Sequence, residues 1–176
     1  AQRRNLTEAE RLFEMSLAVD PFQLNALYNR GIALAELKRF EDALASYDRA
    51  IALKPDNPVF FNNRGNALAE LKRFEEALDS YNRAIAIQAD YRDAFFNRGM
   101  VLSALCRHEE ALDSYDHALA IRPNDSTALI NRANVLIELK RHIQAVENYD
   151  RAIALDPGAL PVFNNRGNAL AELRRF

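Results

Sequence analysis

Apolar and small residues recur along this chain at the spacing of amphipathic helices. In residues 58–91 they fall three or four positions apart from Phe61 to Leu71, and again from Phe74 to Ile87. This spacing gathers them on one face of each stretch, which predicts two amphipathic helices. The polar turn between the two stretches is about three residues long, which suits an antiparallel hairpin.

The ends of these helices carry signals of their own. Asn57 stands where an N-cap is expected, and Pro58 follows at the first helical position, where its missing N–H has no partner to lose. Lys72 and Arg73 lie where the first helix should end, because the dipole of a helix favours cations at its C-terminus. The first helix of this hairpin is therefore expected to begin at residue 58.

A recurring tripeptide indicates that the hairpin is repeated. Asn-Arg-Gly occurs at residues 29–31, 63–65, 97–99 and 165–167, and Asn131-Arg132-Ala133 fills the remaining slot, so consecutive copies start 34 residues apart. A period of this length is typical of one supersecondary unit stacked on copies of itself. The full units are 24–57, 58–91, 92–125 and 126–159, preceded by the second helix of a partial unit at 6–23 and followed by the first helix of another at 160–176.

Several positions of this unit agree with one family. Position 8 holds Gly31, Gly65, Gly99, Ala133 and Gly167; position 20 holds Ala43, Ala77, Ala111 and Ala145; position 24 holds Tyr47, Tyr81, Tyr115 and Tyr149; position 27 holds Ala50, Ala84, Ala118 and Ala152. With Pro55, Pro123 and Pro157 at position 32, the unit resembles the tetratricopeptide repeat (TPR), although Ala89 departs from the proline. The resemblance implies an all-α, right-handed superhelical solenoid of antiparallel helix pairs that binds other proteins. The small residues let two backbones approach, and the tyrosine fills the space between them.

Charge and composition exclude several classes of function. The 176-residue chain has a formal net charge of −2, which argues against a nucleic-acid binder that neutralises phosphates. No stretch approaches the apolar length of a membrane span. The single cysteine, Cys106, excludes an internal disulfide and fits a reducing compartment, so we expect a cytoplasmic protein. Because the sequence starts without a signal-like segment and stops within a unit, we expect it to be a piece of a longer array.

The sequence shows no signature of catalysis, a cofactor or a metal site. It has no Gly-rich phosphate loop and no nucleophile beside a base. His108 and His142 occupy position 17, which Phe40 and Phe74 fill elsewhere, and neither has a partner at ligand spacing. We interpret both histidines as aromatic-sized fillers of a turn, and His117 as a solvated cationic position. An enzyme is therefore not expected within these residues.

The candidate binding residues lie on the first helix of each unit, which lines the concave groove in the TPR family. Position 6 holds Asn29, Asn63, Asn97, Asn131 and Asn165, which we call the Asn ladder; position 9 holds Asn66, Met100, Asn134 and Asn168; position 5 holds Tyr28, Phe96 and Ile130; position 13 holds Glu36, Glu70, Glu138 and Glu172. Their places in the groove are implied by the resemblance.

The Asn ladder has two interpretations. Asn is unfavourable inside a helix, so its recurrence at one interior position needs a reason. A carboxamide offers both donors and an acceptor, and first helices stacked about 8–10 Å apart would meet about every third residue of an extended peptide. The ladder therefore predicts a sequence-tolerant peptide clamp. The alternative is that the Asn side chains bond to one another or to neighbouring helices and join the repeats.

The arginines have a structural interpretation and a functional one. The arginines of position 7 are Arg30, Arg64, Arg98, Arg132 and Arg166. We expect their stems to pack while their guanidiniums reach an acidic or amide partner on the preceding helix, and the candidates are Asp48, Asn82, Asp116 and Asp150. The alternative is that they grip acidic ligands. The basic turns, such as Lys72-Arg73, are expected to form a solvated edge that offsets helix dipoles; the alternative is that this edge docks an acidic partner.

Family analogies suggest a second hypothesis. Positions 2 and 5 contain no Lys or Arg, which argues against the clamp with which some TPR domains hold the acidic C-terminus of heat-shock chaperones. The Asn-rich first helices are instead similar to the N-terminal array of the protein O-GlcNAc transferases. That resemblance implies a substrate-recognition arm of a glycosyltransferase whose catalytic part lies beyond residue 176.

The terminal helices suggest a third hypothesis, a head-to-tail homo-oligomer. A helix at about residues 7–20, opened by a capping box from Thr7 to Glu10, lacks a first-helix partner, and a helix at about 160–174 lacks a second-helix partner. Each is expected to expose an apolar stripe, formed by Leu12, Phe13 and Leu17 on one helix and by Phe163, Leu170 and Leu173 on the other. The two halves add up to one unit, so the end of one molecule would dock on the start of the next.

Overall fold

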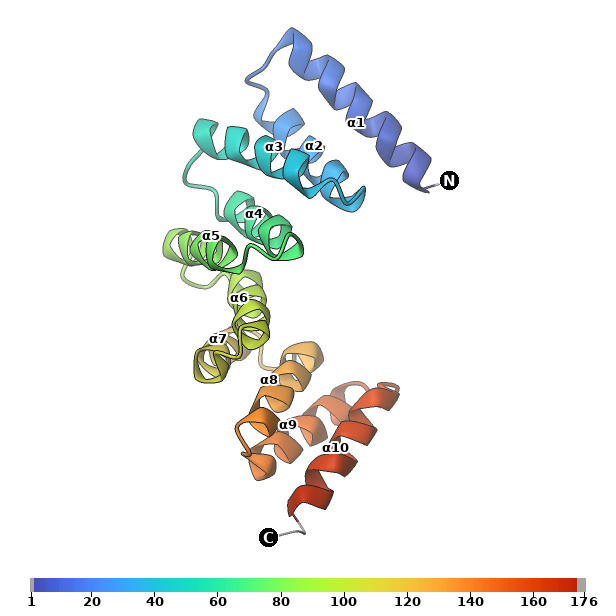
Figure 1. The fold of residues 1–176 in the computed structure, drawn as a ribbon, viewed down its shortest axis with the longest axis vertical. Helices are drawn as coiled ribbons and strands as arrows, with labels where there is room; N and C mark the ends of the chain where they lie inside the picture. The colour runs from blue at the N-terminus through green and yellow to red at the C-terminus, as the bar shows by residue number, and fades with distance from the viewer. Residues whose placement is uncertain (1, 174–176) are drawn as a thin grey trace. The chain divides into compact units, whose positions relative to one another are not determined.

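The computed structural model describes residues 2–173, with side chains from Asn5 onward (Figure 1). Its helices are α1 (Gln2–Val19), α2 (Leu24–Glu36), α3 (Phe40–Leu53), α4 (Pro58–Glu70), α5 (Phe74–Ile87), α6 (Arg92–Ala104), α7 (His108–Ile121), α8 (Ser126–Glu138), α9 (His142–Leu155) and α10 (Leu160–Leu173). No strand occurs in this range, so the expected all-α class is confirmed. Nor is any of these helices long and apolar enough to cross a membrane.

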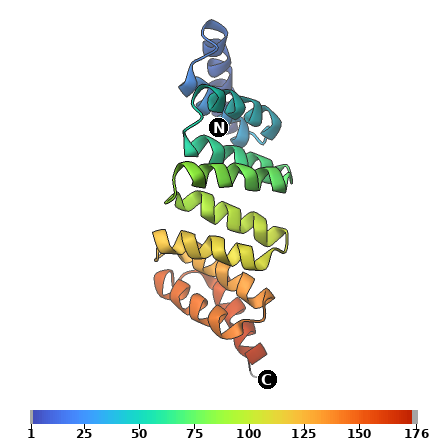
Figure 2. The same ribbon diagram turned by 90° about the vertical axis from the view of Figure 1, so that its left-hand side faces the viewer.

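The helices form hairpins that coincide with the repeat units. The chain divides into two compact units, a first that ends at Ala89 and contains α1 to α5, and a second that begins at Asp90 and contains α6 to α10. Within each unit every helix packs against the next one along the chain (Figure 2). Each unit is therefore a stack of helices in chain order, as expected for a repeat protein.

The two helices of a hairpin approach each other most closely at position 8. A Cβ atom placed on Gly65 would lie 2.5 Å from Cε1 of Tyr81, and one placed on Gly31 would lie 2.4 Å from Cε1 of Tyr47. These distances are far inside van der Waals contact, so the rings occupy space that any other side chain would need. Both tyrosines are almost completely buried, which confirms their expected role as fillers between the helices.

In each full hairpin, a residue in the left-handed conformation, at position 15, follows the end of the first helix. Lys38, Lys72, Cys106 and Lys140 have φ angles of 62°, 62°, 57° and 58°. In the second hairpin the N–H of Lys72 donates to the carbonyl of Ala69 at 3.0 Å, and that of Arg73 donates to Leu68 at 2.9 Å. These are the two hydrogen bonds of a Schellman motif, formed here without glycine. The sequence predicted a basic helix end but not this conformation.

Two first helices of full units, α4 and α8, have side-chain N-caps, whereas α2 and α6 have none. Asn57 Oδ1 accepts a hydrogen bond from the N–H of Val59 at 3.0 Å, so the predicted cap of α4 is confirmed. Asp125 caps α8 in the same way, by accepting from the N–H of Ala128 at 3.0 Å. The carboxamide or carboxylate satisfies a backbone donor that the helix leaves unpaired.

The predicted start of α1 is wrong. Helical conformation begins at Gln2, upstream of Thr7, so Thr7 lies inside the helix and does not cap it. The residues before Thr7 include Gln, Arg and Leu, which have good helix propensities and give no signal to begin later. Glu10, the other half of the predicted capping box, instead accepts a hydrogen bond from Arg30 of α2 at 3.0 Å.

Candidate functional site

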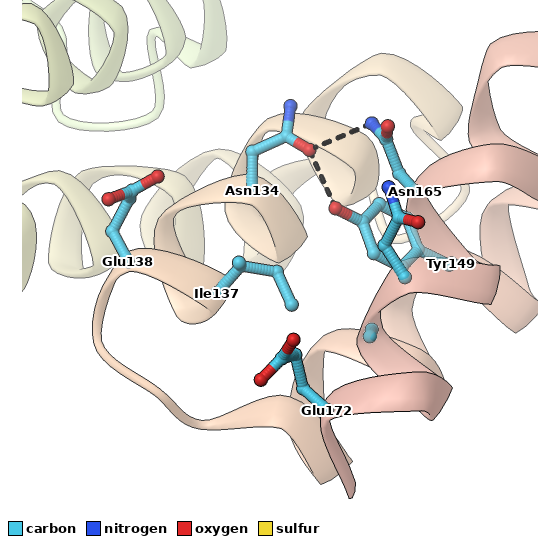
Figure 3. Close-up of a pocket in the computed structure, with 8 residues that line it drawn as sticks. Asn134, Ile137, Glu138, Tyr149, Asn165 and Glu172 are labelled. Carbon is cyan, nitrogen blue, oxygen red and sulfur yellow. Dashed lines mark hydrogen bonds between the residues drawn. The ribbon is translucent and has the colours of Figure 1, made fainter. Parts of the chain in front are cut away.

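A cavity lies on the second unit between α8, α9 and α10 (Figure 3). Its volume is about 290 Å³, and it is lined by Asn134, Ile137, Glu138, Tyr149, Asn165, Asn168, Ala169 and Glu172. Apart from Tyr149 and Ala169, these residues occupy positions 6, 9, 12 and 13 of consecutive first helices. The cavity therefore brings together residues from the positions at which the sequence places a binding groove.

Asn134 Oδ1 is the centre of the hydrogen bonds in this cavity. It accepts from the hydroxyl of Tyr149 at 2.7 Å and from Nδ2 of Asn165 at 3.3 Å (Figure 3). Burial raises the pKa of Tyr149, and the hydrogen bond with Asn165 lowers it in part. The hydroxyl of Tyr149 therefore stays protonated and can donate its hydrogen bond to Asn134. The network fixes the orientation of two amides at the wall of the cavity.

The first unit contains a related arrangement. Asn63 Nδ2 of α4 donates to the hydroxyl of Tyr28 of α2 at 3.0 Å, and the hydroxyl of Tyr81 donates to Asn66 Oδ1 at 2.9 Å. Asn63, like Asn165, thus uses its amide nitrogen to reach the preceding first helix. For these two ladder residues the joining role, which the sequence left open beside the clamp, is present in the structure.

Some of the other predicted groove residues pack against neighbouring rings, and others are exposed to solvent or half-buried. Tyr28 contacts the rings of Tyr47 and Phe60, with centroids 6.3 and 5.0 Å apart, and Phe96 lies against Tyr115 at 5.9 Å. Asn29, Met100 and Asn168 are exposed, whereas Asn97, Ile130 and Asn131 are half-buried. The aromatic residues of position 5 therefore pack on the position 24 tyrosine of their own hairpin. This packing fixes their rings beside the first helix.

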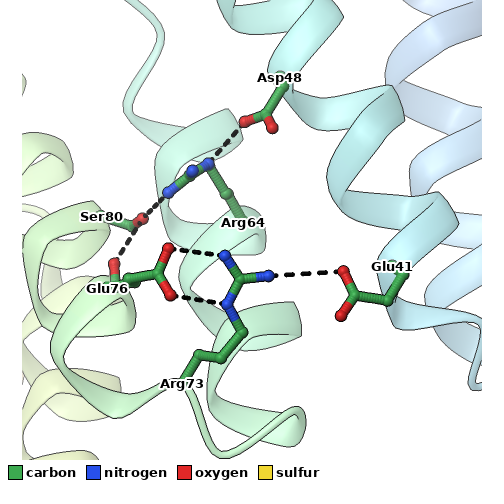
Figure 4. Close-up of polar contacts among 6 residues, drawn as sticks. All are labelled: Glu41, Asp48, Arg64, Arg73, Glu76 and Ser80. Atoms are coloured by element: carbon green, nitrogen blue, oxygen red, sulfur yellow. Dashed lines mark hydrogen bonds and ion pairs between the residues drawn. The ribbon is translucent and has the colours of Figure 1, made fainter.

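The arginines of position 7 join consecutive helices, as the structural interpretation predicted. Arg64 of α4 donates through Nε to Asp48 of α3 at 2.6 Å and through Nη1 to Ser80 of α5 at 2.7 Å (Figure 4). Arg132 reaches Asp116 at 2.6 Å, and Arg166 pairs with Asp150. The serines that accept from these arginines at position 23, which sequence reasoning missed, are Ser46, Ser80 and Ser114.

The basic turns lie at the surface, as expected for a solvated edge, and their arginines also form ion pairs there. Arg73 forms two hydrogen bonds of 2.7 Å with Glu76 of its own hairpin and one of 3.4 Å with Glu41 of the preceding hairpin (Figure 4). The hydrogen bonds with Arg73 lower the pKa of Glu76. Arg141 reaches Glu109 in the same way at 2.6 Å. Acidic residues of the second helices therefore hold these cations in place.

The histidines occupy structural positions. His108 and His142 are half-buried at the first residue of α7 and of α9, which agrees with their interpretation as fillers of the turn. His117, expected at a solvated position, is exposed, and its ring also stacks on Phe95 with centroids 4.9 Å apart. Among the described residues no group of three or more His, Cys, Asp or Glu side chains is placed to hold a metal ion.

The terminal helices expose only part of the predicted apolar stripes. Leu12 of α1 is 56% exposed and Phe163 of α10 is 44% exposed. Leu17, which was expected on the exposed stripe, is instead buried in a cluster with Leu27 and Phe60, because it faces α2. Phe13, Leu170 and Leu173 are half-buried.

The comparisons with known proteins agree with this architecture. Models described as TPR repeat and tetratricopeptide repeat match residues 33–72, 59–124 and 126–159. A search of curated proteins gives no match. Hairpins of this kind, repeated every 34 residues, define a helical repeat protein. The chain belongs to the tetratricopeptide repeat family.

Solved structures share the fold. MamA, residues 41 to the end, from Desulfovibrio magneticus RS-1 is 20% identical with a TM-score of 0.82, over 90% of this chain and 89% of that one. YrrB, described as a TPR protein with an unusual peptide-binding site, is 21% identical with a TM-score of 0.79, over 93% and 84%. The first TPR domain of Spaghetti (RPAP3), bound to the HSP90 peptide SRMEEVD, is 28% identical with a TM-score of 0.65, over 66% and 93%.

Proposed function

We propose that this chain is a non-catalytic scaffold for protein–protein interaction and that the cavity between α8, α9 and α10 binds an extended segment of a partner protein. The observation that carries the proposal is the set of amides from positions 6 and 9 of consecutive first helices around one cavity of about 290 Å³. Peptide binding by similar folds, described for YrrB and for the RPAP3 domain, supports it.

The amides still have hydrogen-bonding capacity directed at a ligand. Asn165 donates to Asn134, but within the described residues its Oδ1 accepts no hydrogen bond, and the amide of Asn168 forms none. An amide group can accept from a peptide N–H and donate to a peptide carbonyl, whatever side chains the peptide carries. Asn165 therefore combines the two roles, since its nitrogen joins the repeats while its oxygen is left for the ligand.

Asn168→Ala is the sharpest test, because Asn168 is exposed and has no hydrogen bond to lose within the described residues. Fluorescent, acetylated nonapeptides of randomised sequence should bind the native protein, and Asn168→Ala should weaken binding by about ten-fold, the value of one or two peptide hydrogen bonds. The matched control is Asn124→Ala, in an exposed loop outside the cavity. Equal binding by all three proteins would contradict the proposed site.

We also propose that two copies of this 176-residue polypeptide pair end to end, α10 of one against α1 of the other. The supporting observation is Gly167. A Cβ atom on Gly31, Gly65 or Gly99 meets a tyrosine ring at 2.4 to 2.8 Å, whereas one on Gly167 meets nothing within 4 Å. The socket that receives an aromatic ring in the full hairpins is therefore open on α10.

The register of α1 supplies the matching ring. Phe13 occupies position 24 of the leading half-unit, the position of Tyr47 in the next, and Leu12 occupies position 23, where Ser46 is only 1% exposed. Docking Phe13 of one copy over Gly167 of another would repeat the contact that already forms between the helices of each full hairpin. It would also cover Phe163, whose counterpart Leu129 is fully buried.

Gly167→Leu tests this pairing, because the socket is filled without disturbing a contact inside the chain. Sedimentation velocity of the native polypeptide should show mass that rises with concentration, and Gly167→Leu should stay monomeric. Leu155→Glu, at an exposed position near the end of α9, should associate like the native chain. A native polypeptide that stays monomeric would refute the pairing. Appending a copy of residues 143–159 after residue 176, which keeps the repeat register, should also prevent association, because that helix would cover α10 within one molecule.

A further inference from the structure

We propose that another cavity, on the first unit, binds the last residue of a partner protein when that residue is apolar. The cavity is lined by the loop between α1 and α2, by α2 and by the end of α3, and its volume is about 130 Å³. Its lining residues are Pro21, Phe22, Leu27, Arg49, Ala52 and Leu53, of which only Arg49 carries a polar side chain. A space of this size accommodates one apolar group, since an apolar cavity of about 150 Å³ holds benzene. The proposal does not depend on the cavity between α8, α9 and α10.

Phe22 distinguishes this cavity from the rest of the array. It is 73% exposed, and its position, 33, holds polar or small residues in the following units, namely Asp56, Asp90, Asn124 and Gly158. The other five lining residues recur unchanged three repeats later, as Pro123, Leu129, Arg151, Ala154 and Leu155. The ring of Phe22 therefore adds an apolar wall to a frame that the repeat already supplies, and an apolar ligand would remove that wall from water.

Arg49 supplies the charge that the ligand should match. Its Nη2 donates to the carbonyl of Pro21 at 2.8 Å, which holds the guanidinium beside the cavity. Among the described residues Arg49 forms no other hydrogen bond and no ion pair. Two nearby acids are engaged elsewhere, because Asp48 accepts from an arginine of α4 at 2.6 Å and Asp20 accepts from a loop N–H at 3.0 Å. A guanidinium with N–H groups to spare is suited to a carboxylate.

An apolar wall beside an available cation fits the C-terminus of a protein chain. A C-terminal Leu, Ile, Val or Met carries an apolar side chain and a carboxylate on the same Cα atom, whereas the same residue inside a chain carries no charge there. Lys54, the exposed residue after Leu53, also forms no ion pair among the described residues, and its charge offsets the negative end of the α3 dipole. The side chain of the ligand fills the cavity beside Phe22 and Leu53, and its carboxylate lies at Arg49.

The test uses three short peptides: acetyl-Ala-Ala-Leu as the free acid, the same peptide as its C-terminal amide, and acetyl-Ala-Ala-Gly as the free acid. In amide NMR spectra of the protein, the Leu acid should shift the backbone signals of Phe22, Ala52 and Leu53 and the Nε–H signal of Arg49. It should bind about three-fold more tightly than the Leu amide, the value of one exposed ion pair. It should bind about ten-fold more tightly than the Gly acid, which leaves the cavity empty. High salt should reduce the preference for the acid over the amide, because exposed charges are screened.

Arg49→Gln should abolish the preference for the acid over the amide. The matched control is Arg151→Gln, because Arg151 donates to the carbonyl of Pro123 at 3.2 Å in the same way, but the loop there carries Asn124 in place of a phenylalanine. This control should keep the preference. Phe22→Asn, which removes an exposed ring, should weaken binding of the Leu acid about five-fold.

Three results would overturn the proposal. Equal affinity of the native protein for the Leu acid and the Leu amide would exclude a carboxylate site, and shifts confined to residues outside the cavity would exclude the site itself. If Phe22→Asn lowered the concentration-dependent mass in sedimentation velocity, Phe22 would be a contact between copies of the chain. None of these results bears on the cavity between α8, α9 and α10, which Asn168→Ala tests separately.

Discussion

At the scale of single residues, the glycine of position 8 and the tyrosine of position 24 act as a pair. Gly65 leaves the space that Tyr81 fills, and the same pairing recurs between Gly31 and Tyr47. The fourth hairpin carries Ala133 at this position and still buries its tyrosine, so a methyl group is accommodated where the surrounding packing is adjusted for it. The tightness of the contact is thus a property of each hairpin.

Gly65→Ala should therefore lower the stability of the protein, although alanine is the better helix former. A new methyl carbon 2.5 Å from the Tyr81 ring forces the ring or α5 to shift, at a cost of about 1–3 kcal/mol for overpacking, offset by about 1 kcal/mol of helix propensity. Urea unfolding measures the difference. The matched control is Gly167→Ala, which meets nothing within 4 Å and should raise stability by about 0.5–1 kcal/mol. A stabilising Gly65→Ala would contradict this account of the contact.

The buried tyrosines predict a loss of stability in alkali. Burial raises the pKa of Tyr81 above its ordinary value near 10, and the charge of Glu70 adds to the rise. The folded protein therefore keeps a neutral hydroxyl where the unfolded chain ionises. The stabilising contribution is complete below pH 10 and falls as pH rises above 10 towards the pKa of the folded state.

Tyr81→Phe should remove the pH-dependent contribution of the Tyr81 hydroxyl to the stability of the protein. At pH 7 it should cost about 1 kcal/mol, because the hydrogen bond to Asn66 is lost. At pH 11 the native protein also loses about 1.4 kcal/mol per buried tyrosine, which outweighs the lost hydrogen bond, so the variant should be as stable as the native protein or slightly more stable. Urea unfolding at pH 7, 9 and 11 measures both values, and a gap between the two proteins that does not change with pH would refute the argument.

At the scale of elements, the left-handed residue of position 15 controls where each first helix stops. Lys72 has a φ of 62°, a conformation in which the Cβ of an L-residue is crowded by its own backbone. The Schellman hydrogen bonds from Lys72 and Arg73 hold it there. The lysine side chain itself is exposed, and its Nζ lies 5.7 Å from the centre of the Phe74 ring, a cation–π contact of small value at the surface.

Lys72→Gly should stabilise the second hairpin. Glycine removes about 1–2 kcal/mol of strain at this φ and loses about 0.5–1 kcal/mol through its greater freedom when unfolded, which leaves a gain of about 0.5–1 kcal/mol. Thermal and urea unfolding measure it. The adjacent change Arg73→Gly should act in the opposite direction, because it removes the ion pairs to Glu76 and Glu41. A destabilising Lys72→Gly would show that position 15 is not strained.

The helices of the full units were predictable because their signals are local. Periodicity of apolar residues places α4 and α5, and Asn57 with Pro58 marks the start of α4. The start of α1 was not predictable from Thr7, because the residues before Thr7 favour helix and extend α1 past the capping box to Gln2. The left-handed conformation at position 15 was not predicted either, because these positions hold no glycine, the usual residue for it.

The sequence predicted which repeat positions line the candidate site, but not which hydrogen bonds form there. The register of the repeat selects positions 6, 9 and 13, and residues from these positions line the cavity. Which amide atom of Asn165 faces Asn134 depends on rotamers and on helix spacing, and the sequence alone contains neither. Partners of the position 7 arginines were predictable because Asp48, Asp116 and Asp150 fall at one fixed step from them. The glycosyltransferase hypothesis stays a prediction, because it concerns residues outside this array.

At the scale of the whole molecule, the contacts within each unit join helices that are close in sequence. Beyond adjacent helices, the remaining packing pairs are α2 with α4, α6 with α8, and α8 with α10, all between consecutive first helices. Stability in such an array is a sum of hairpin terms and neighbour terms, and no contact depends on a distant part of the chain. Removal of one complete repeat should therefore leave a folded protein.

Deletion of residues 58–91 tests this additivity. It joins Asn57, still an N-cap, to Arg92, and it brings Arg98 of the following first helix to Asp48, so the arginine–carboxylate link between neighbouring repeats is kept. Helix content per residue should be unchanged, and the urea m-value should fall by about a fifth, the share of the chain removed. Deletion of residues 74–91 alone is the control, because it places two first helices in succession and leaves Gly65 without its tyrosine. That control should unfold without cooperativity or aggregate, and if the full-repeat deletion behaved the same way, the array would not be additive.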